Sequence, residues 1–374
     1  MALIPRKIQP EIEKWLFKGK ILIIYGTRQV GKTTLVKQLM QGREDQAYYL
    51  NCDESDIREA LTNKTTTQLK DFIGNKTFIV IDEAQRVENI GITLKLLVDN
   101  FPEIQIIATG SSSFDLSNKI KETLAGRKIE FILYPFSVEE LLTHESRLEF
   151  TRLLPSRLVY GTYPEIYNSN ERETRLRDLA DTYLYKDLYE QQPIKNPELL
   201  RRLLQALALQ VCSEVSYPEL SVMLGIAKET VTRYVFLLIQ THVIFVLPPY
   251  RSNIRATIGK QRKIYFNDLG IRNALINNFN PLELRNDVGA LWENYCILER
   301  RKFNNNQMRF PNTYFWRAYN RAEIDYLEDI NGALSAWEFK YNEERIHPPK
   351  AFFDVYPQTP FKLVNRFNYL DFVS

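Results

Sequence analysis

The sequence is poor in cysteine and has no long apolar run. Its three cysteines, Cys52, Cys212 and Cys296, lie far apart and form no C-x-x-C pair. This argues against a disulfide framework or a structural zinc site, and it is typical of proteins in a reducing cytoplasm. The longest apolar stretch, residues 235–247, contains polar side chains and is too short to cross a bilayer. Charge soon follows the N-terminus, with no signal-type apolar core, so we expect a cytoplasmic protein with no membrane partner.

A large excess of one charge is also missing. The chain has 49 Lys and Arg against 46 Asp and Glu, a net charge of +3 that neither demands nor excludes nucleic acid. Its 374 residues are enough for two or three domains, and hydrophobic and charged contents of 44% and 25% are ordinary for globular proteins. No repeat or low-complexity segment stands out.

One stretch near the N-terminus carries the phosphate-binding pattern G-x-x-x-x-G-K-[ST]. It follows an apolar, β-branched run at residues 21–25 and precedes a segment of helical spacing at 32–40. In this context the glycines let successive N–H groups point inward, and the helix N-terminus adds partial positive charge. We expect ATP to bind here, with Lys32 reaching the β- and γ-phosphates and Thr33 ligating Mg²⁺. The binding loop comprises Gly26, Thr27, Arg28, Gln29, Val30, Gly31, Lys32, Thr33 and Thr34.

Apolar strands and helical segments alternate through the first 136 residues. Alternation of this kind predicts an α/β fold with a parallel sheet and helices on both faces. Further strands are expected at residues 47–51, 77–83, 104–110 and 128–133. Ligands of such sheets bind at the carboxyl ends of the strands.

Two of these strands end in polar residues suited to phosphoryl transfer. After the strand at 77–83, we expect Asp82 to hold Mg²⁺ through water and Glu83 to orient and polarise the attacking water. After the strand at 104–110, Ser111 is the first candidate for a residue that senses the γ-phosphate, and Thr109 is the second. A serine-rich turn without a role is the alternative for this last position.

An arginine that contacts the γ-phosphate would complete the site. Arg127, which directly precedes the fifth strand, is the candidate. An arginine that contacts a γ-phosphate contributes on the order of 10³–10⁵ in rate. Arg28 and Arg6 are weaker candidates. A solvated or ion-paired side chain is the alternative for an arginine at the start of a strand.

Residues 137–195 are mostly of helical pattern and are expected to form a lid over the nucleotide and a connector. Beyond them, residues 217–224 and 227–240 flank Gly225 with the spacing of a helix-turn-helix. Strands expected at 243–247 and 263–266 flank a basic loop, which gives the layout of a winged helix.

Basic side chains of this segment suit the phosphates of DNA. They are Lys228, Arg233, Arg251, Arg255, Lys260 and Arg262. Since the second helix of the pair is not strongly basic, a winged helix used for packing or subunit contact is the alternative.

The C-terminal part resembles the restriction-endonuclease-type fold. Glu293 lies on an expected helix, Asp325 lies on a strand-like segment, and Glu338 and Lys340 share one face of the next strand. The resemblance implies that Asp325 and Glu338 ligate a second Mg²⁺, that Lys340 steadies the attacking water or the phosphate, and that Glu293 completes the site. Folds of this kind also serve only to bind. Two closing strands are expected at residues 362–365 and 369–373.

Taken together, the motifs resemble those of AAA-type ATPases of bacteria and archaea that carry a C-terminal domain of unknown function. The likeness covers nearly the whole chain, and the motifs are specific in combination. They read GTRQVGKTT, FIVIDEAQ, ATGSSS, LAGR, YFNDLG, WEN and EFK. The resemblance implies an AAA core, then a winged helix, then a restriction-endonuclease-like module.

We therefore predict four parts: an AAA-type core at 1–136, a helical lid and connector at 137–195, a winged helix at 196–275 and a restriction-endonuclease-like domain at 276–374. The leading function is Mg²⁺-dependent binding and hydrolysis of ATP, coupled to DNA binding by the C-terminal half. An ATP-dependent nuclease and a nucleotide-switched protein–protein assembly module are the alternatives. The oligomeric state, the source of any arginine finger and the preferred DNA remain open at this point.

Overall fold

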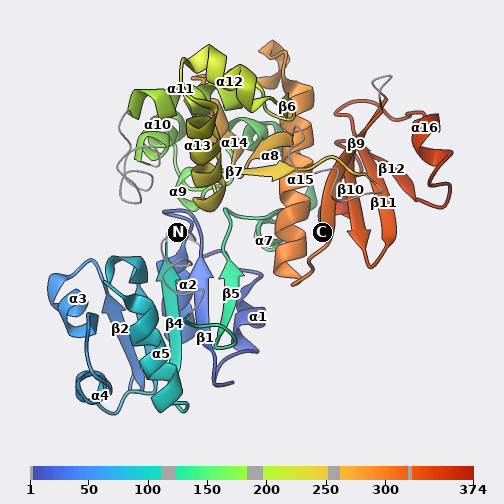
Figure 1. Cartoon of the computed structure of the whole chain (residues 1–374). Helices are drawn as coiled ribbons and strands as arrows, with labels where there is room; N and C mark the ends of the chain where they lie inside the picture. Colours follow the sequence, from blue (N-terminus) through green and yellow to red (C-terminus); the bar gives the residue numbers. More distant parts are fainter. Residues whose placement is uncertain (1–2, 111–122, 183–196, 252–261, 319–321) are drawn as a thin grey trace.

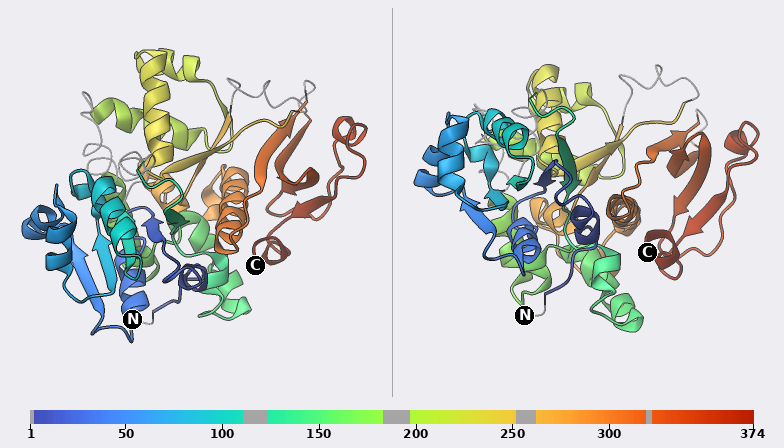
Figure 2. Two further views of the ribbon diagram at one scale, coloured as in Figure 1. Left: turned by 60° about the horizontal axis from the view of Figure 1, so that its bottom comes forward. Right: turned by 90° about the horizontal axis from the view of Figure 1, so that it is seen from below.

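The computed structural model describes residues 3–110, 123–182, 197–251, 262–318 and 322–374. Figure 1 shows a sheet built by the N-terminal residues, a helical middle region next to the carboxyl ends of its strands, and a second sheet at the C-terminal end. Both views of Figure 2 place the two sheets on opposite sides of the helical region. Within the described ranges, no helix is long and apolar enough to cross a membrane.

The N-terminal sheet is entirely parallel in the pairings described. Its strands lie in the spatial order β2 (Ala47–Asn51), β3 (Phe78–Asp82), β4 (Gln105–Gly110), β1 (Ile21–Tyr25) and β5 (Lys128–Ile132). Every residue of β1 is buried, because helices cover both faces of the sheet. The predicted parallel α/β sheet is thereby confirmed.

Alternate residues of β1 belong to different cores. Leu22 and Ile24 pack with the helices of one face, whereas Ile21 and Ile23 pack with those of the other. The first face carries α1 (Gln9–Glu13) and α2 (Lys32–Met40), and the second carries α3 (Ser55–Leu61), α4 (Thr66–Ile73) and α5 (Ile90–Asn100).

The helical middle region is packed around one short helix, α14 (Leu269–Leu275). This helix contacts α8 (Arg147–Tyr160), α10 (Arg172–Thr182) and α11 (Pro197–Leu209). A Cβ atom at Gly270 would lie 2.2 Å from the carbonyl oxygen of Tyr160, so only glycine permits this close approach. Asp268 caps α14 and also accepts a hydrogen bond from the backbone N–H of Thr162 at 2.9 Å. Helices α7 (Val138–Leu141) and α9 (Pro164–Tyr167) also belong to this region.

Next come the two helices expected to form a helix-turn-helix. They are α12 (Tyr217–Leu224) and α13 (Lys228–Gln240), joined through Gly225, whose φ of +65° suits glycine. The strands β7 (Ile244–Leu247) and β8 (Arg262–Phe266) then pair antiparallel, and β6 (Glu214–Val215) joins β8. Each of these helices and the β7–β8 pair begins and ends within one residue of the bounds expected from the sequence.

A long helix, α15 (Val288–Asn306), lies between the middle region and the C-terminal sheet (Figure 1). Within this helix Glu299 and Lys302 form a buried ion pair, and both side chains also hydrogen-bond to the segment that follows β5. Glu299 accepts the backbone N–H of Val138 at 2.8 Å, and Lys302 donates to the carbonyl of Phe136 at 2.9 Å. The C-terminal part is therefore attached to the segment that leaves β5.

The C-terminal sheet has the order β12 (Phe361–Val364), β11 (Ala333–Phe339), β10 (Glu323–Ile330) and β9 (Asn312–Arg317). The pairings β9–β10 and β10–β11 are antiparallel, whereas β11–β12 is parallel. Helix α16 (Lys350–Phe353) precedes β12.

The strand expected at 369–373 is wrong, because residues 370–373 form helix α17 (Leu370–Val373). Tyr369, Phe372 and Val373 are buried, and their spacing of three and four residues is helical rather than alternating. The ring of Tyr369 packs against Trp292 of α15 with centroids 5.4 Å apart. Tertiary packing has overridden the strand-like composition of this short segment.

Candidate functional site

The phosphate-binding pattern forms a turn between β1 and α2. A Cβ atom at Gly26 would lie 2.4 Å from the carbonyl oxygen of Leu133, so a larger residue would collide with the neighbouring chain. Gly31 occupies the N-cap of α2 with a φ of +98°, a conformation that L side chains rarely adopt. Glycine is therefore required at position 26 by the closeness of the neighbouring chain and at position 31 by the backbone conformation. Both glycines shape the turn at the helix N-terminus.

The lysine of the motif folds back over this turn. Its Nζ atom donates to the carbonyl oxygens of Gly26 and Thr27, both at 2.9 Å, and the residue is 5% exposed. Lys32 is thus held at the mouth of the loop, where a phosphate would meet its ammonium group.

Hydroxyl groups converge on the carboxylate of Asp82. Thr33 donates to Asp82 Oδ2 at 2.7 Å, Tyr49 donates to the same oxygen, and Thr109 donates to Oδ1. Burial and the bond to Asp82 raise the pKa of Tyr49, which keeps its hydroxyl protonated as a donor. The side chains of Thr33 and Asp82 are the two that the sequence assigns to Mg²⁺. These two side chains suit a magnesium ion, because they place a hydroxyl oxygen and a carboxylate oxygen next to each other.

Glu83 directly follows the strand and has a φ of +54°. Its backbone N–H donates to the hydroxyl of Thr109 at 3.2 Å, and its carboxylate accepts from the side chain of Gln85 at 2.5 Å. Thr109 therefore joins both acidic residues through one hydroxyl, and it is fully buried. Ser111, the first candidate for the phosphate sensor, lies outside the described residues.

A cavity of about 500 Å³ lies over the loop. One side is formed by Gln29, Gly31, Lys32, Thr33, Thr34 and Glu83, and the other by Pro164, Glu165, Asn168, Ser169 and Arg175 of the α9–α10 region. The cavity thus brings the catalytic residues expected from the loop and from β3 together against a helical segment. Arg175, which forms an ion pair with Glu165, also lines this cavity, although no motif in the sequence points to it.

Arg127 does not belong to this cavity, and the role expected for it is wrong for this chain's own site. It precedes β5 at the amino ends of the strands, where its carbonyl accepts the N–H of Ile21. Its guanidinium is paired with Asp99 at 2.6 Å, at the end of α5. Arg127 therefore lies at the end of the sheet opposite to the phosphate loop, where it forms an exposed ion pair with Asp99.

Arg6 is buried and supports the loop from behind. It donates to the carbonyl oxygens of Val30 and Tyr134 and forms an ion pair with Glu140 at 3.0 Å. Because its donors are directed at the protein, Arg6 positions the phosphate loop and is not a ligand for the γ-phosphate. Arg28, the other weak candidate, is partly buried within the loop.

One residue of the middle region contacts the phosphate loop, and a second is influenced by the charge of its lysine. The hydroxyl of Tyr163 donates to Thr27 Oγ1 at 2.7 Å. His242, which follows α13, has a buried Nε2 atom with no hydrogen-bond partner in the described parts of the chain. Burial and the charges of Arg301 and Lys32 lower its pKa to about 4, so its imidazole is neutral. The loop is therefore in direct or electrostatic contact with the region beyond the first sheet.

The expected DNA-contacting side chains are only partly described. Lys228, Arg233 and Arg251 are exposed and Arg262 is partly buried, whereas Arg255 and Lys260 lie outside the described residues. The same two helices, α12 and α13, also expose the apolar side chains of Val222, Met223 and Phe236 by 84%, 54% and 49%.

The C-terminal residues expected at a second magnesium site do come close together, but around a lysine. Lys263 of β8 is 3% exposed, and its ammonium lies 3.0 Å from Glu293 and 3.8 Å from Asp325, with Glu323 closer still. Glu338 pairs with Lys340 at 2.8 Å. Sequence reasoning missed Lys263 and Glu323, because nothing near Lys263 in the sequence links it to the C-terminal strands.

Burial and neighbouring charges shift the pKa values of the acidic residues and of Lys263 in this cluster. Burial raises the pKa of Glu293 to about 7 and also raises the pKa values of Asp325 and Glu338. Burial alone would lower the pKa of Lys263, but the carboxylates of Glu293, Asp325 and Glu323 raise it above its ordinary value. Lys263 is thus the cation that these acids already share. No group of three or more His, Cys, Asp or Glu in the described residues is arranged to hold a metal ion. The cluster therefore does not fit a metal ion while Lys263 is in place.

Three family models match successive parts of the chain. A family model described as an AAA domain matches residues 18–142, and two domains of unknown function, DUF8612 and DUF4143, match 151–282 and 288–363. The parallel sheet and the phosphate loop thus belong to an AAA-type P-loop domain. This AAA domain forms the N-terminal part of the chain, and domains of unknown function follow it.

Similar proteins occur in bacteria and archaea. An uncharacterized protein of Mycobacterium tuberculosis is 27% identical over 352 residues, which cover 91% of this chain and 74% of that protein. Another, of Methanocaldococcus jannaschii, is 26% identical over 348 residues, covering 86% and 74%.

Among solved structures, the Pif1 helicase from Candida albicans is similar over 53% of this chain and 50% of its own, at 17% identity and a TM-score of 0.27. Drosophila ORC bound to AT-rich DNA and Cdc6 is similar over 72% of this chain and 92% of that chain, at 11% identity and a TM-score of 0.25.

Proposed function

We propose that the protein binds ATP with Mg²⁺ and hydrolyses it in the cavity between the phosphate loop and the α9–α10 region. The contact between Thr33 and Asp82 carries this proposal, because it joins a loop hydroxyl to a carboxylate beside Lys32. Mg²⁺ would be held by these two oxygen-bearing side chains and would neutralise charge on the phosphates. Lys32 and the backbone N–H groups of the loop bind and orient the triphosphate.

Glu83 is the residue that orients the attacking water in this proposal. It lines the same cavity as Lys32, and its backbone is fixed through Thr109, which also holds Asp82. One hydroxyl therefore sets the relative positions of the metal ligand and the water-orienting carboxylate. Phosphoryl transfer depends mainly on such positioning and on charge stabilisation.

Arg175 takes the role that the sequence assigned to Arg127. It faces the phosphate loop across the cavity from α10 of the same chain, and its present partner, Glu165, is also a lining residue. A triphosphate competes with Glu165 for this guanidinium, because both offer anionic oxygens. Arg175 is thus placed to stabilise charge on the γ-phosphate in cis.

We propose further that the nucleotide acts on a DNA-contacting C-terminal half. In this proposal residues 1–136 form the AAA core, 137–195 a lid and connector, 196–275 a winged helix and 276–374 a restriction-endonuclease-like module. Support comes from the contacts of Tyr163 with the loop and from the exposed Lys228, Arg233 and Arg251.

Protein–protein assembly is a second candidate for the middle region. The exposed Val222, Met223 and Phe236 favour it, since large exposed apolar side chains on one pair of helices are typical of surfaces that contact protein. The nuclease alternative has no such support, because Lys263 lies beside Asp325 and Lys340 pairs with Glu338, the two carboxylates that a second magnesium ion would need.

A filter-binding panel of duplex, single-stranded and branched DNA, with and without Mg·ATP, tests the coupling. Glu83→Gln traps bound nucleotide, so it is expected to retain DNA in the ATP-bound state without turnover. Salt-dependent retention that changes with nucleotide and is weakened by Arg233→Glu supports the DNA role. Absence of binding at low salt, with nucleotide binding intact, favours protein assembly instead.

A further inference from the structure

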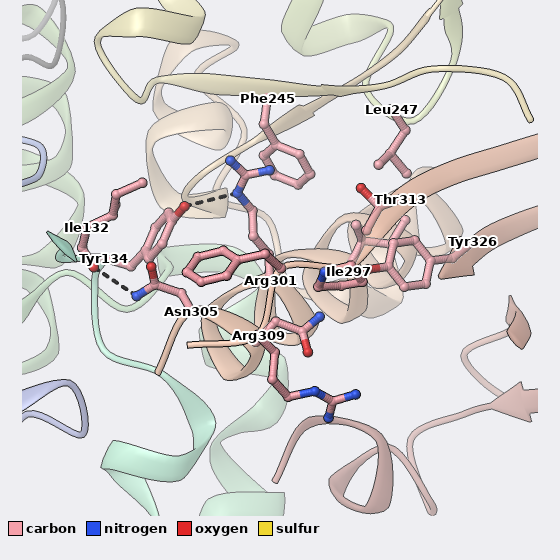
Figure 3. A pocket seen from close by; sticks show the side chains of 13 residues that line it. Ile132, Tyr134, Phe245, Leu247, Ile297, Arg301, Asn305, Arg309, Thr313 and Tyr326 are labelled. Carbon is pink, nitrogen blue, oxygen red and sulfur yellow. Dashed lines mark hydrogen bonds between the residues drawn. The ribbon is translucent and has the colours of Figure 1, made fainter. Parts of the chain in front are cut away.

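A second cavity lies where the two sheets and the middle region meet (Figure 3). It has a volume of about 220 Å³ and shares no lining residue with the cavity over the phosphate loop. Its walls come from the end of β5, from β7, from α15 with the turn that follows it, and from β9 and β10. This volume lies below the roughly 300–1,000 Å³ that is usual for ligand cavities, so the cavity encloses only a small group, such as one part of a nucleotide.

Arg301 is a cation of this cavity that has no counter-ion among the described residues. Its Nε atom donates to the hydroxyl of Tyr134 at 3.0 Å, and its guanidinium lies 4.9 Å from the ring centroid of Phe245. No carboxylate in the described ranges lies within 4.0 Å of it, and the same holds for Arg309, which also lines the cavity. A partly buried cation without an acidic partner is costly unless an anion binds there.

Asn304 supplies a buried acceptor that lacks a donor. Its Nδ2 atom donates to Glu328 Oε1 at 2.7 Å, so the amide cannot be turned around without facing one oxygen with another. Glu328 is itself fixed by Arg300, which donates to both carboxylate oxygens at 2.8 Å. Asn304 Oδ1 has no hydrogen-bond partner among the described residues, although the residue is only 5% exposed and lines the cavity.

Aromatic rings form much of the remaining wall. Tyr134, Phe245 and Tyr326 line the cavity, and Phe310, which is 78% exposed, stands at its edge. Figure 3 shows the rings of Tyr134 and Phe245 beside Arg301, and the ring of Tyr326 near Thr313 at the other side of the cavity. Rings of this kind bind flat heteroaromatic groups by stacking or by edge contacts.

We propose that this cavity is a second nucleotide site, which takes one nucleotide unit. The base lies among the aromatic rings and donates an N–H group to Asn304 Oδ1, while its phosphate meets Arg301 and Arg309. These three requirements, a flat ring, an N–H donor and an anion, are met together by a nucleotide. Free mononucleotide and a nucleotide unit of a DNA strand have the same chemistry, so the test must separate these two sources.

This inference does not need ATP to bind at the phosphate loop. If the bound nucleotide belongs to a DNA strand, the inference rests on the proposed DNA role and extends it, because it assigns one DNA contact to α15 rather than to α13. The two proposals fail separately if binding is measured in Lys32→Ala protein, in which the phosphate loop is disabled.

The test uses the full-length Lys32→Ala protein, with AMP as one probe and a fluorescent single-stranded oligodeoxyadenylate as the other. Arg309→Glu is the test variant, since Arg309 is exposed and its backbone contacts remain. Arg152→Glu, an equal charge change at an exposed position of α8, is the matched control. We expect Arg309→Glu to weaken binding of one or both probes about 10- to 100-fold, while Arg152→Glu leaves it unchanged.

Photo-crosslinking locates the ligand independently of affinity. With 8-azido-AMP or a photoreactive oligonucleotide, labelled peptides are expected to contain residues 304–313 or the segment around Tyr134. AMP labelling assigns the site to free mononucleotide, and labelling by the oligonucleotide alone assigns it to a strand. If neither probe binds Lys32→Ala protein, if Arg309→Glu and Arg152→Glu behave alike, or if neither probe labels these peptides, the proposal is overturned.

Discussion

The hydroxyl of Thr33 lies 2.7 Å from Oδ2 of Asp82, and this contact joins the phosphate loop to the end of β3. The two residues are distant in the sequence, and they meet because β1 and β3 both flank β4 in one parallel sheet. Tyr49 and Thr109 donate to the same carboxylate from β2 and β4. Four strands thus contribute, directly or through the loop, to the position of one acidic group.

Replacing Asp82 by asparagine tests the role of this carboxylate in catalysis. The amide keeps the shape but removes the charge that Mg²⁺ requires, so we expect the rate of ATP hydrolysis to fall by about 10²-fold or more. Phosphate release at several Mg²⁺ concentrations measures the effect. Asp45→Asn, at an exposed position before β2, is the control. A rate equal to that of the control would remove Asp82 from the site.

Arg175 and Arg127 give opposite predictions for the same substitution. Arg175→Ala should lower kcat by about 10³-fold, since an arginine at the γ-phosphate contributes on the order of 10³–10⁵ in rate. Arg127→Ala should leave kcat unchanged, because its side chain is exposed and paired with Asp99. Single-turnover hydrolysis separates this effect from product release. If Arg127→Ala is the slower variant, a second subunit supplies its guanidinium to the site.

Lys263 is expected to be a major contributor to the stability of the C-terminal half. Lys263→Met leaves buried carboxylates without their cation, which costs about 3–5 kcal/mol. The matched change Lys340→Met should cost less, because Lys340 is 37% exposed in its side chain. Urea unfolding of both variants, followed by the tryptophan fluorescence of Trp292 and its neighbours, measures the difference. Equal losses would mean that Lys263 is not the shared counter-ion.

The loss in Lys263→Met should shrink in acid. Glu293 has a pKa of about 7 in the folded chain, above the ordinary 4.5, so the folded state binds its proton more tightly. The stabilisation from this protonation is complete below pH 4.5 and disappears as the pH rises through about 7. Removing the ammonium raises the pKa of Glu293 further. The free energy of unfolding of the variant should therefore continue to fall above pH 7, where that of the parent protein levels off, and parallel curves would contradict this account.

His242 should make the protein less stable in weak acid. Its pKa of about 4 in the folded chain lies below the ordinary 6.5, so only the unfolded state takes up its proton as the pH falls from 6.5 to 4. This costs roughly 3 kcal/mol at pH 4. His242→Asn removes the titration, and asparagine tolerates the φ of +56°. The difference between the two unfolding curves should be independent of pH above about pH 8 and shift in favour of the variant in acid; a constant difference at all pH values would show that His242 does not titrate.

The sequence was most informative where the fold and the site depend on residues that are close together in the chain. The phosphate loop lies within nine consecutive positions, and Asp82 with Glu83 directly follows an apolar strand, so local pattern was enough to select them. The helices α12 and α13 were likewise located from spacing and a glycine turn. In each case short-range geometry determines the structure.

The contacts that were missed join residues far apart in the sequence. Arg175 is one of several arginines on a highly charged helix, and only packing brings it to the cavity. Lys263 lies on a strand whose own pattern is apolar, and its acidic partners belong to another domain. Arg127 is a candidate in the sequence because it lies next to β5. It precedes the amino end of that strand, however, whereas the phosphate loop lies at the carboxyl end of the sheet. The helix α17 was missed because four residues carry too little periodicity to distinguish it from a strand.

Calorimetric titration of Mg·ATP into the folded protein, and into Lys32→Ala protein, tests the central claim most directly. We expect saturable binding of one Mg·ATP at the phosphate loop, which is weakened by Lys32→Ala while the circular dichroism spectrum stays unchanged. Absence of heat in the folded parent protein, or equal affinities for the two proteins, would contradict the assignment of the loop as the nucleotide site.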